Sequence, residues 1–182
     1  MIVPGPVGPG APGPELRAMV PADVPQVAEL ERQLFGPSAW TEAMLAGELH
    51  APGRWYLAAV EWPGDDSGDG VDAADGARSG TVVGYAGLWF DGDVSQVMTI
   101  GVAHAVQRQG VGTALLAALV ERSRELGAGA VLLEVAVDNA PAMALYERFG
   151  FEVLTRRRRY YQPEDVDAWT MRLELAGPAD SD

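Results

Sequence analysis

The chain has 182 residues, which suits one domain with a substantial core and is short for two independent domains. Its net charge is −13, from 13 basic and 26 acidic residues, and this acidic excess argues against general binding of nucleic acid and is compatible with a cationic substrate. The absence of cysteine excludes disulfides, thiolate chemistry and metals bound through sulfur. All the basic residues are arginine, so a Schiff-base lysine is excluded as well.

No segment carries the pattern of a membrane or export signal. No run approaches the roughly eighteen apolar residues that a membrane span needs. The stretch MIVPGPVGPGAPGP lacks a positively charged start and is interrupted by proline and glycine, so it does not resemble a signal peptide. His50 and His104 are too far apart for a local metal motif. These features predict a cytoplasmic protein without a membrane span or a structural metal.

Hydrophobic periodicity divides the chain into strands and helices. In chain order, the expected elements are a strand at 15–20, a helix at 24–35, a helix that begins near Thr41, strands at 55–62, 81–90 and 94–103, a helix at 111–126, a strand at 130–137, a helix at 140–149, and strands near 151–161 and 168–175. Strands and helices mix without strict alternation, which predicts an α+β or mixed α/β sheet.

Three residues mark where helices should begin or end. Asp23 stands at the N-cap position of the first helix, and Thr41 could cap the second. Gly127 follows the last apolar residue of the third helix and is expected to stop it.

One folded domain is expected at residues 15–175, with a tail on each side and an insertion within it. Residues 1–14 are rich in proline and glycine and are expected to be a disordered tail. Residues 63–80 hold turn formers and acids with almost no large apolar residue, so we expect a flexible surface insertion in a hairpin connection. Residues 176–182 are expected to be a C-terminal tail.

A glycine-rich stretch, QRQGVG at 107–112, lies between an expected strand and a long helix. Glycines let the backbone approach a ligand closely, and free N–H groups at a helix start favour an anion. The stretch is neither a Walker A loop nor a dinucleotide fingerprint, because it lacks both GK[ST] and GxGxxG. By itself it could equally be a tight turn, with Arg108 either solvated or a phosphate ligand.

Two motifs in a set order carry a family resemblance. Q-x-x-G-x-G at 107–112 is followed by a helix, a strand and then N-x-x-A-x-x-L-Y-x-x-x-G-F, from Asn139 to Phe151. Together they resemble the GCN5-related N-acetyltransferase (GNAT) superfamily. Finer features are similar to its RimI branch, the ribosomal-protein-alanine N-acetyltransferases: L-E-V at 133–135, A-L-Y-E-x-x-G-F at 144–151, R-x-Y-Y at 158–161, D-A-x-x-M at 167–171 and the aromatic stretch FGPSAWTEAML.

This resemblance implies a GNAT fold, with a mixed, mostly antiparallel sheet of about six to seven strands and about four flanking helices. It also implies acetyl-CoA as the donor and no metal. The pantetheine arm would contact backbone groups of Ile100, Gly101 and Val102. The pyrophosphate would be cradled by Arg108, Gln109, Gly110, Val111, Gly112 and Thr113. Asn139 would reach the cofactor, and it could also cap the helix that follows it.

Acetyl transfer from a thioester to an amine makes three chemical demands. The ammonium must lose a proton, the developing oxyanion needs a donor, and the leaving thiolate benefits from a proton. A peptide α-amine has a pKa of about 7.7–8.0, so a modest base suffices near neutral pH, whereas a lysine amine, at about 10.4, needs more help. A protein N-terminus is therefore a chemically reasonable acceptor.

Glu134 is the candidate general base. On a strand it shares one face with Leu132 and Ala136, whereas the other face is plainly apolar core. The carboxylate therefore faces solvent or a cleft. The alternative from spacing alone is a glutamate at a strand end that pairs with a neighbouring arginine; the resemblance favours the base.

Tyr146 is the candidate general acid. It follows Asn139 by two helical turns, so both lie near one face of the short helix. A phenol can protonate the leaving thiolate or donate a hydrogen bond to the sulfur. Without the resemblance, a core aromatic is an equally good interpretation.

Two other features have weaker interpretations. His104, just after a strand, is an alternative base, although a histidine in a loop is usually just exposed. The arginine run at 156–159 could suggest nucleic acid, but we expect a strand-edge or salt-bridge role, because four arginines do not overcome the net acidity.

The sequence therefore predicts an acetyl-CoA-dependent N-α-acetyltransferase that acts on protein N-termini. The resemblance suggests a small-subunit ribosomal protein, through its N-terminal alanine, as acceptor. One alternative keeps the fold and acetylates a lysine side chain or a small amine. Another is a catalytically silent acyl-CoA-binding module that works through a protein partner. Neither nucleic-acid nor membrane binding is expected.

Overall fold

The computed structural model describes residues 13–62, 80–163 and 165–175. The expected tails at 1–14 and 176–182 and the expected insertion at 63–80 fall almost entirely outside these described residues. Within them, no helix is long and apolar enough to cross a membrane.

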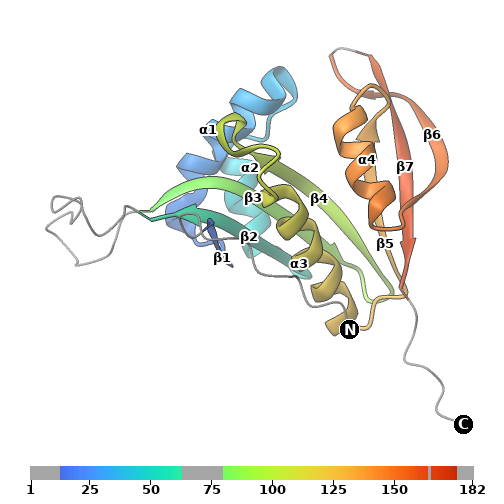
Figure 1. The fold of residues 1–182 in the computed structure, drawn as a ribbon, viewed down its shortest axis with the longest axis horizontal. Helices are drawn as coiled ribbons and strands as arrows, with labels where there is room; N and C mark the ends of the chain where they lie inside the picture. The colour runs from blue at the N-terminus through green and yellow to red at the C-terminus, as the bar shows by residue number, and fades with distance from the viewer. Residues whose placement is uncertain (1–12, 63–79, 164, 176–182) are drawn as a thin grey trace, which may run out of the picture.

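One seven-stranded sheet in the order β1-β2-β3-β4-β5-β7-β6 forms the centre of the fold (Figure 1). The strands are β1 (Glu15–Ala18), β2 (Arg54–Glu61), β3 (Thr81–Phe90), β4 (Val94–Val102), β5 (Ala130–Ala136), β6 (Glu152–Tyr161) and β7 (Val166–Glu174). The helices are α1 (Val24–Phe35), α2 (Glu42–His50), α3 (Val111–Glu125) and α4 (Ala140–Arg148). Every expected element is present with bounds that differ by one or two residues, and the predicted mixed, mostly antiparallel sheet is confirmed.

The sheet divides where β4 meets β5. This is its parallel pair, and its register runs only from Val94–Gln96 on β4 to Ala130–Leu132 on β5. Beyond Gln96 the two strands separate, and Figure 1 shows them diverging into two halves of the molecule. The first half holds β1 to β4, and the second holds β5, β7 and β6.

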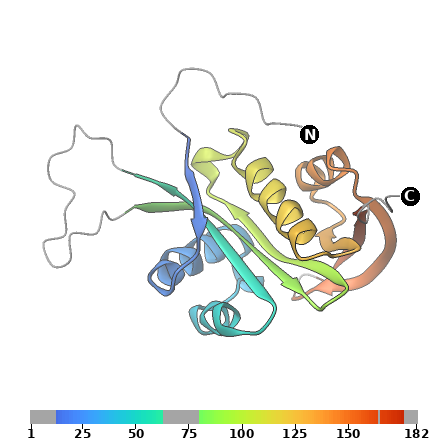
Figure 2. The same ribbon diagram turned by 90° about the horizontal axis from the view of Figure 1, so that it is seen from below.

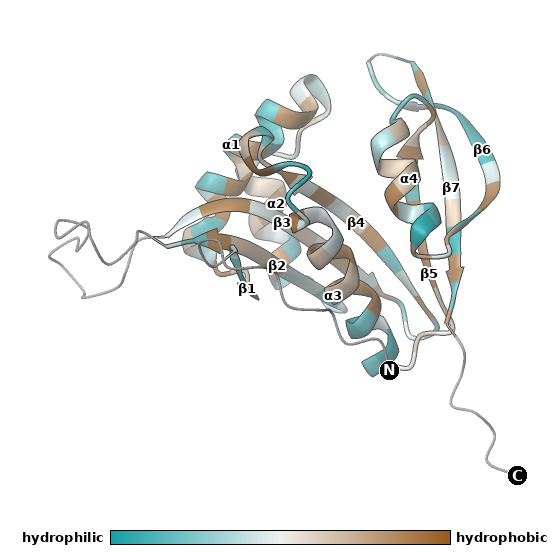
Figure 3. Cartoon of the chain, in the orientation of Figure 1, coloured by the Kyte–Doolittle hydropathy of each residue, from teal (hydrophilic) through white to brown (hydrophobic). Residues whose placement is uncertain are grey.

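Helices cover both faces of the first half (Figure 2). On one face, α1 and α2 pack Val27, Leu30 and Leu45 against β2 and β3. On the other face, α3 packs Leu115 and Leu119 into a core that continues to β5, β7 and α4. Figure 3 shows hydrophobic residues along the central strands and a mostly hydrophilic β6 at the sheet edge. Apolar packing therefore holds the two halves together beneath the point where the strands diverge.

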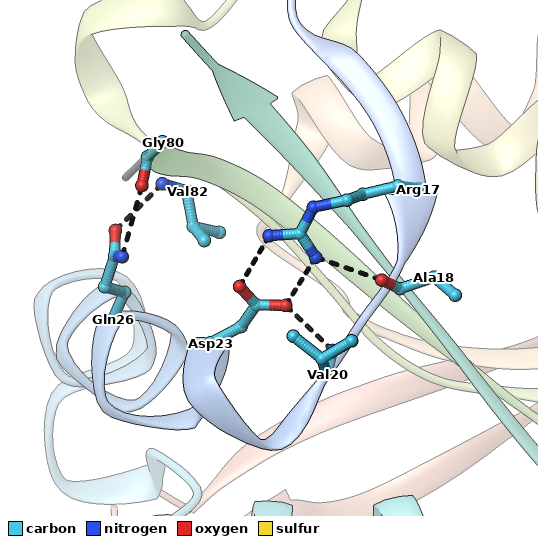
Figure 4. Close-up of polar contacts among 7 residues, drawn as sticks. All are labelled: Arg17, Ala18, Val20, Asp23, Gln26, Gly80 and Val82. Carbon is cyan, nitrogen blue, oxygen red and sulfur yellow. Dashed lines mark hydrogen bonds and ion pairs between the residues drawn. The ribbon is translucent and has the colours of Figure 1, made fainter. Parts of the chain in front are cut away.

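The start of α1 differs from the prediction. Asp23 occupies the N-cap position, but its carboxylate makes no capping bond to the helix. It accepts hydrogen bonds from both terminal nitrogens of Arg17, at 2.7 Å each, and from the backbone N–H of Val20 at 2.8 Å (Figure 4). The reason is that a 3-10 turn, Pro21–Asp23, precedes the helix and directs the carboxylate back towards β1. Burial opposes ionisation, but these bonds outweigh it and lower the pKa of Asp23.

The other two expected helix signals are confirmed. The Thr41 hydroxyl accepts a hydrogen bond from the N–H of Met44 at 3.3 Å and caps α2. Gly127 adopts a φ of 76° directly after α3, the left-handed conformation that ends a helix.

Gly101 on β4 lies opposite Tyr85 of β3, and the buried Tyr85 ring fills the space that a side chain at Gly101 would need. Gly101→Ala should therefore lower the free energy of unfolding by about 1–3 kcal/mol through overpacking. Urea unfolding measures this loss. Gly47→Ala is the matched control, because nothing lies within 4 Å of a methyl group there and alanine favours the interior of α2. Equal stability of the two variants would show that the ring yields to the methyl group.

Candidate active site

A cleft of about 360 Å³ opens where β4 and β5 diverge. Both halves of the molecule contribute to its walls. The residues that line it are Glu31, Phe35, Ser38 and Trp40 from α1 and the α1–α2 connection, Val97 to Ile100 from β4, Leu133 to Ala136 from β5, Asp138, Asn139, Ala142 and Tyr146 from the start of α4 and before it, and Tyr161 and Val166 from β6 and β7.

Glu134 lies on the cleft wall, with its side chain 11% exposed. Its neighbours Leu133 and Val135 are buried, as the strand alternation predicts. One carboxylate oxygen accepts a hydrogen bond from Nε2 of Gln96 and the other from Nη1 of Arg157, each at 3.0 Å. Glu134 thus both pairs with an arginine and faces the cleft, although the sequence had offered these as alternatives.

Tyr146 reaches the same cleft from α4. The ring is only 8% exposed and packs against Phe151 with centroids 5.8 Å apart, so it is also a core aromatic. Burial raises the pKa of Tyr146 to about 12. The phenol is therefore protonated at neutral pH and available as a hydrogen-bond donor.

The glycine-rich loop lies at the end of β4, beyond the cleft residues. Gly110 has a φ of 90° and Arg108 a φ of 61°, so the backbone turns sharply before α3. Ala114 makes the first backbone bond into the helix, to Gly110 at 2.9 Å, and the N–H groups of residues 111–113 have no partner in the part of the chain that the structure describes. A methyl group on Gly110 would meet nothing within 4 Å, so the space beside this residue is open. Free amides beside open space fit an anionic ligand such as a pyrophosphate.

The remaining predicted residues are placed as follows. Ile100 lines the cleft, and Gly101 and Val102 continue β4 towards the loop. Asn139 lines the cleft and caps α4, because its Oδ1 accepts from the N–H of Ala142 at 3.2 Å. His104 is exposed, contacts Gln107 and does not line the cleft.

Comparison with known proteins agrees with this geometry. Residues 38–151 match the acetyltransferase (GNAT) family. The chain is 39% identical to the N-alpha-acetyltransferase RimI of Mycobacterium tuberculosis over 89% of its own length and 93% of that protein. The chain belongs to the GNAT family.

Solved structures extend this result. The ribosomal-protein-S18-alanine N-acetyltransferase of Escherichia coli superposes with a TM-score of 0.73 at 25% identity, over 92% of this chain and 97% of that one. Arabidopsis thaliana NAA60 in complex with acetyl-CoA gives a TM-score of 0.72 at 19% identity, over 89% and 98% of the two chains, and this likeness shows the fold alone.

Tyr161 and Glu31 also line this GNAT cleft but were not predicted from the sequence. Tyr161 donates a hydrogen bond from its hydroxyl to the backbone carbonyl of Glu134, at 3.3 Å, and burial raises its pKa. Tyr161 is the last residue of the R-x-Y-Y motif, but the motif alone did not predict which residue it contacts. Glu31 could have been found, because it follows Val27 by one helical turn and so places a charge on the apolar face of α1.

Two arginines of the run at 156–159 form salt bridges from the edge strand β6. Arg156 pairs with Asp167 of β7 at 2.7 Å and Arg157 pairs with Glu134, so the expected salt-bridge role is confirmed for these two. Among the described residues, no group of histidine, aspartate or glutamate is arranged to hold a metal ion.

The phenol of Tyr146 should ionise near pH 12, whereas an exposed tyrosine ionises near pH 10. Because the folded protein holds this proton more tightly than the unfolded chain, the stability that Tyr146 contributes is complete below pH 10 and is lost as the pH rises towards 12. Phenolate absorbance after a rapid pH jump, compared between the wild type and Tyr146→Phe, isolates this titration. A difference that titrates near pH 10 would contradict the burial argument.

Proposed function

We propose that the chain is an acetyl-CoA-dependent N-α-acetyltransferase that acts on protein N-termini, with the N-terminal alanine of a small-subunit ribosomal protein as acceptor. One observation carries the proposal: Glu134 and Tyr146 line the same cleft in a chain 39% identical to an N-alpha-acetyltransferase over nearly its whole length. The E. coli structure, whose protein acts on ribosomal protein S18, supports the acceptor class.

The donor would extend from the glycine-rich loop along the free edge of β4 into the cleft. Amides of residues 108–113 would bind the pyrophosphate. Backbone groups of residues 100–102 would pair with the pantetheine arm, since β4 has no strand partner on this side beyond Gln96. Asn139 lies at the same opening. Acetyl-CoA supplies the activated acetyl group as a thioester.

The chain's own residues would move the protons. Glu134 accepts a proton from the acceptor ammonium, through water, and the freed nitrogen lone pair can then attack the acetyl carbonyl. Tyr146 donates a hydrogen bond to the sulfur as negative charge develops there. Its raised pKa favours this donor role over complete proton transfer, because a thiol ionises at about 8.5. No covalent enzyme intermediate is needed, in keeping with the absence of cysteine.

The proposal is tested with peptides that carry different N-terminal residues, incubated with the protein and acetyl-CoA and analysed by intact mass. We expect one acetyl group on peptides with a free α-amine and an N-terminal alanine. The matched control is the same peptide with a blocked α-amine and a free lysine. Acetylation of that control would favour a lysine acceptor, and no acetylation of any peptide, despite bound acetyl-CoA, would favour a binding module.

Glu134→Gln and Tyr146→Phe should each lower turnover by about 10²-fold or more, because the first removes a general base and the second a hydrogen-bond donor to the leaving sulfur, with little change in the affinity for acetyl-CoA. For Glu134→Gln the loss should be greatest at low pH, where the acceptor amine is mostly protonated. Steady-state kinetics and calorimetric titration of acetyl-CoA measure the two effects. Turnover like that of the wild type in Tyr146→Phe would remove its assignment, and an unchanged pH profile in Glu134→Gln would point to another base.

A further inference from the structure

A second carboxylate, that of Glu31 on α1, lies in the cleft without a role in the chemistry above. The residue is 1% exposed. One of its oxygens accepts a hydrogen bond from the Thr99 hydroxyl at 2.9 Å, and the other accepts from the backbone N–H of Trp40 at 3.1 Å. A buried carboxylate is costly unless hydrogen bonds compensate it, so these two contacts offset part of the cost of burying Glu31. The carboxylate also lies beside the buried Tyr85 hydroxyl of β3, where burial and then the charge of Glu31 raise the pKa of the phenol.

The first contact reaches β4 at a bulge. Val97 pairs with Leu88 and Thr99 with Gly87, which leaves Met98 as an extra residue. Met98 packs against the core of α1 and α2, and Thr99 bonds to Glu31 on α1, so both consecutive side chains lie on the same side of the sheet. The bulge thus presents a hydroxyl to α1 immediately before Ile100, the first of the residues proposed to contact the donor.

The second contact holds the α1–α2 connection, residues 36–41. Ser38 and Trp40 of this segment line the cleft. The Ser38 hydroxyl also donates to the backbone carbonyl of Gln162, between β6 and β7, at 2.8 Å. The connection therefore bridges the two halves of the molecule, with Glu31 at one end and Gln162 at the other.

Helix α1 has attachments to the sheet other than Glu31. Helix α1 is already fixed at its start by Asp23 and Arg17, and Gln26 accepts from the N–H of Val82 on β3 at 2.9 Å (Figure 4). Val27 is also fully buried in the core. Replacing a buried charge with an apolar residue of similar volume is often neutral or stabilising. The bonds made by Glu31 are therefore best explained by what they hold in place.

We propose that Glu31 is a positioning residue that fixes the α1–α2 connection against the β4 bulge, so that the wall contacted by the acceptor keeps a set distance from the strand that binds the donor. This role rests on the proposed acetyltransferase function. Glu31 itself touches no reacting atom.

A first test does not depend on activity. Glu31→Leu keeps a side chain of similar volume but removes both acceptor oxygens, so neither the Trp40 amide nor the Thr99 hydroxyl has its partner. Hydrogen exchange of the Trp40 amide, followed by nuclear magnetic resonance in the free protein, should become about ten-fold faster or more, since a bond to a charged group is lost. The matched control is Asp23→Asn, which removes the charge of another buried carboxylate. Asp23 lies just before α1 and does not line the cleft. It should leave Trp40 exchange unchanged.

A second test uses kinetics. Glu31→Leu and Thr99→Val should each raise the KM for the acceptor peptide by about ten-fold while the affinity for acetyl-CoA stays within about two-fold. Because both changes break one linkage, the double variant should lose less than the product of the two single losses. Asp23→Asn should lower the melting temperature without changing either kinetic constant.

The outcomes separate the two proposals. Unchanged Trp40 exchange in Glu31→Leu, or equal effects of Glu31→Leu and Asp23→Asn, would overturn the positioning role. If the wild type acetylates no peptide and Trp40 exchange still accelerates, the proposed function fails and the link between Glu31 and the connection stands.

Discussion

The short pairing between β4 and β5 is the constraint on which the rest of the molecule depends. Three residues of each strand are in register, and the strands then part. A parallel pair that continued would bond the edge of β4 to β5 and close the opening between the two strands. Because it stops, β4 keeps an unpaired edge, β5 presents alternate side chains to an opening, and α4 brings Tyr146 to the same place.

Sequence patterns predicted the elements well because strands and helices here follow local periodicity. The L-E-V stretch at 133–135 and the motif from Asn139 to Phe151 made Glu134 and Tyr146 the candidate residues. What the sequence could not predict are contacts between distant residues. Gln96 lies 38 residues from Glu134 and Arg157 lies 23 residues from it, and both bonds depend on strand order and register. The order β5-β7-β6 brings Arg157 near Glu134, with β7 between their strands.

Asp23 and Glu31 show two limits of local patterns. A capping residue was expected from its place before an apolar run, but a short turn redirected its carboxylate to Arg17. Glu31 lies on the buried face of α1, and the apolar residues of that face predicted only a packing surface. In both cases the partner of a buried charge, which lies elsewhere in the chain, determines what the charge does.

The pairing of Glu134 has a consequence for how a cationic acceptor could enter. Arg157 reaches Glu134 from the edge strand with half of its side chain in water, whereas Gln96 comes from the neighbouring β4. An incoming ammonium carries the same sign as the guanidinium and needs the same carboxylate. In the proposed reaction it would exchange with Arg157, whose guanidinium lies 4.4 Å from the centroid of the Tyr160 ring, while Gln96 keeps the carboxylate in place. The site would thus replace one cation with another without leaving Glu134 unpaired in the cleft.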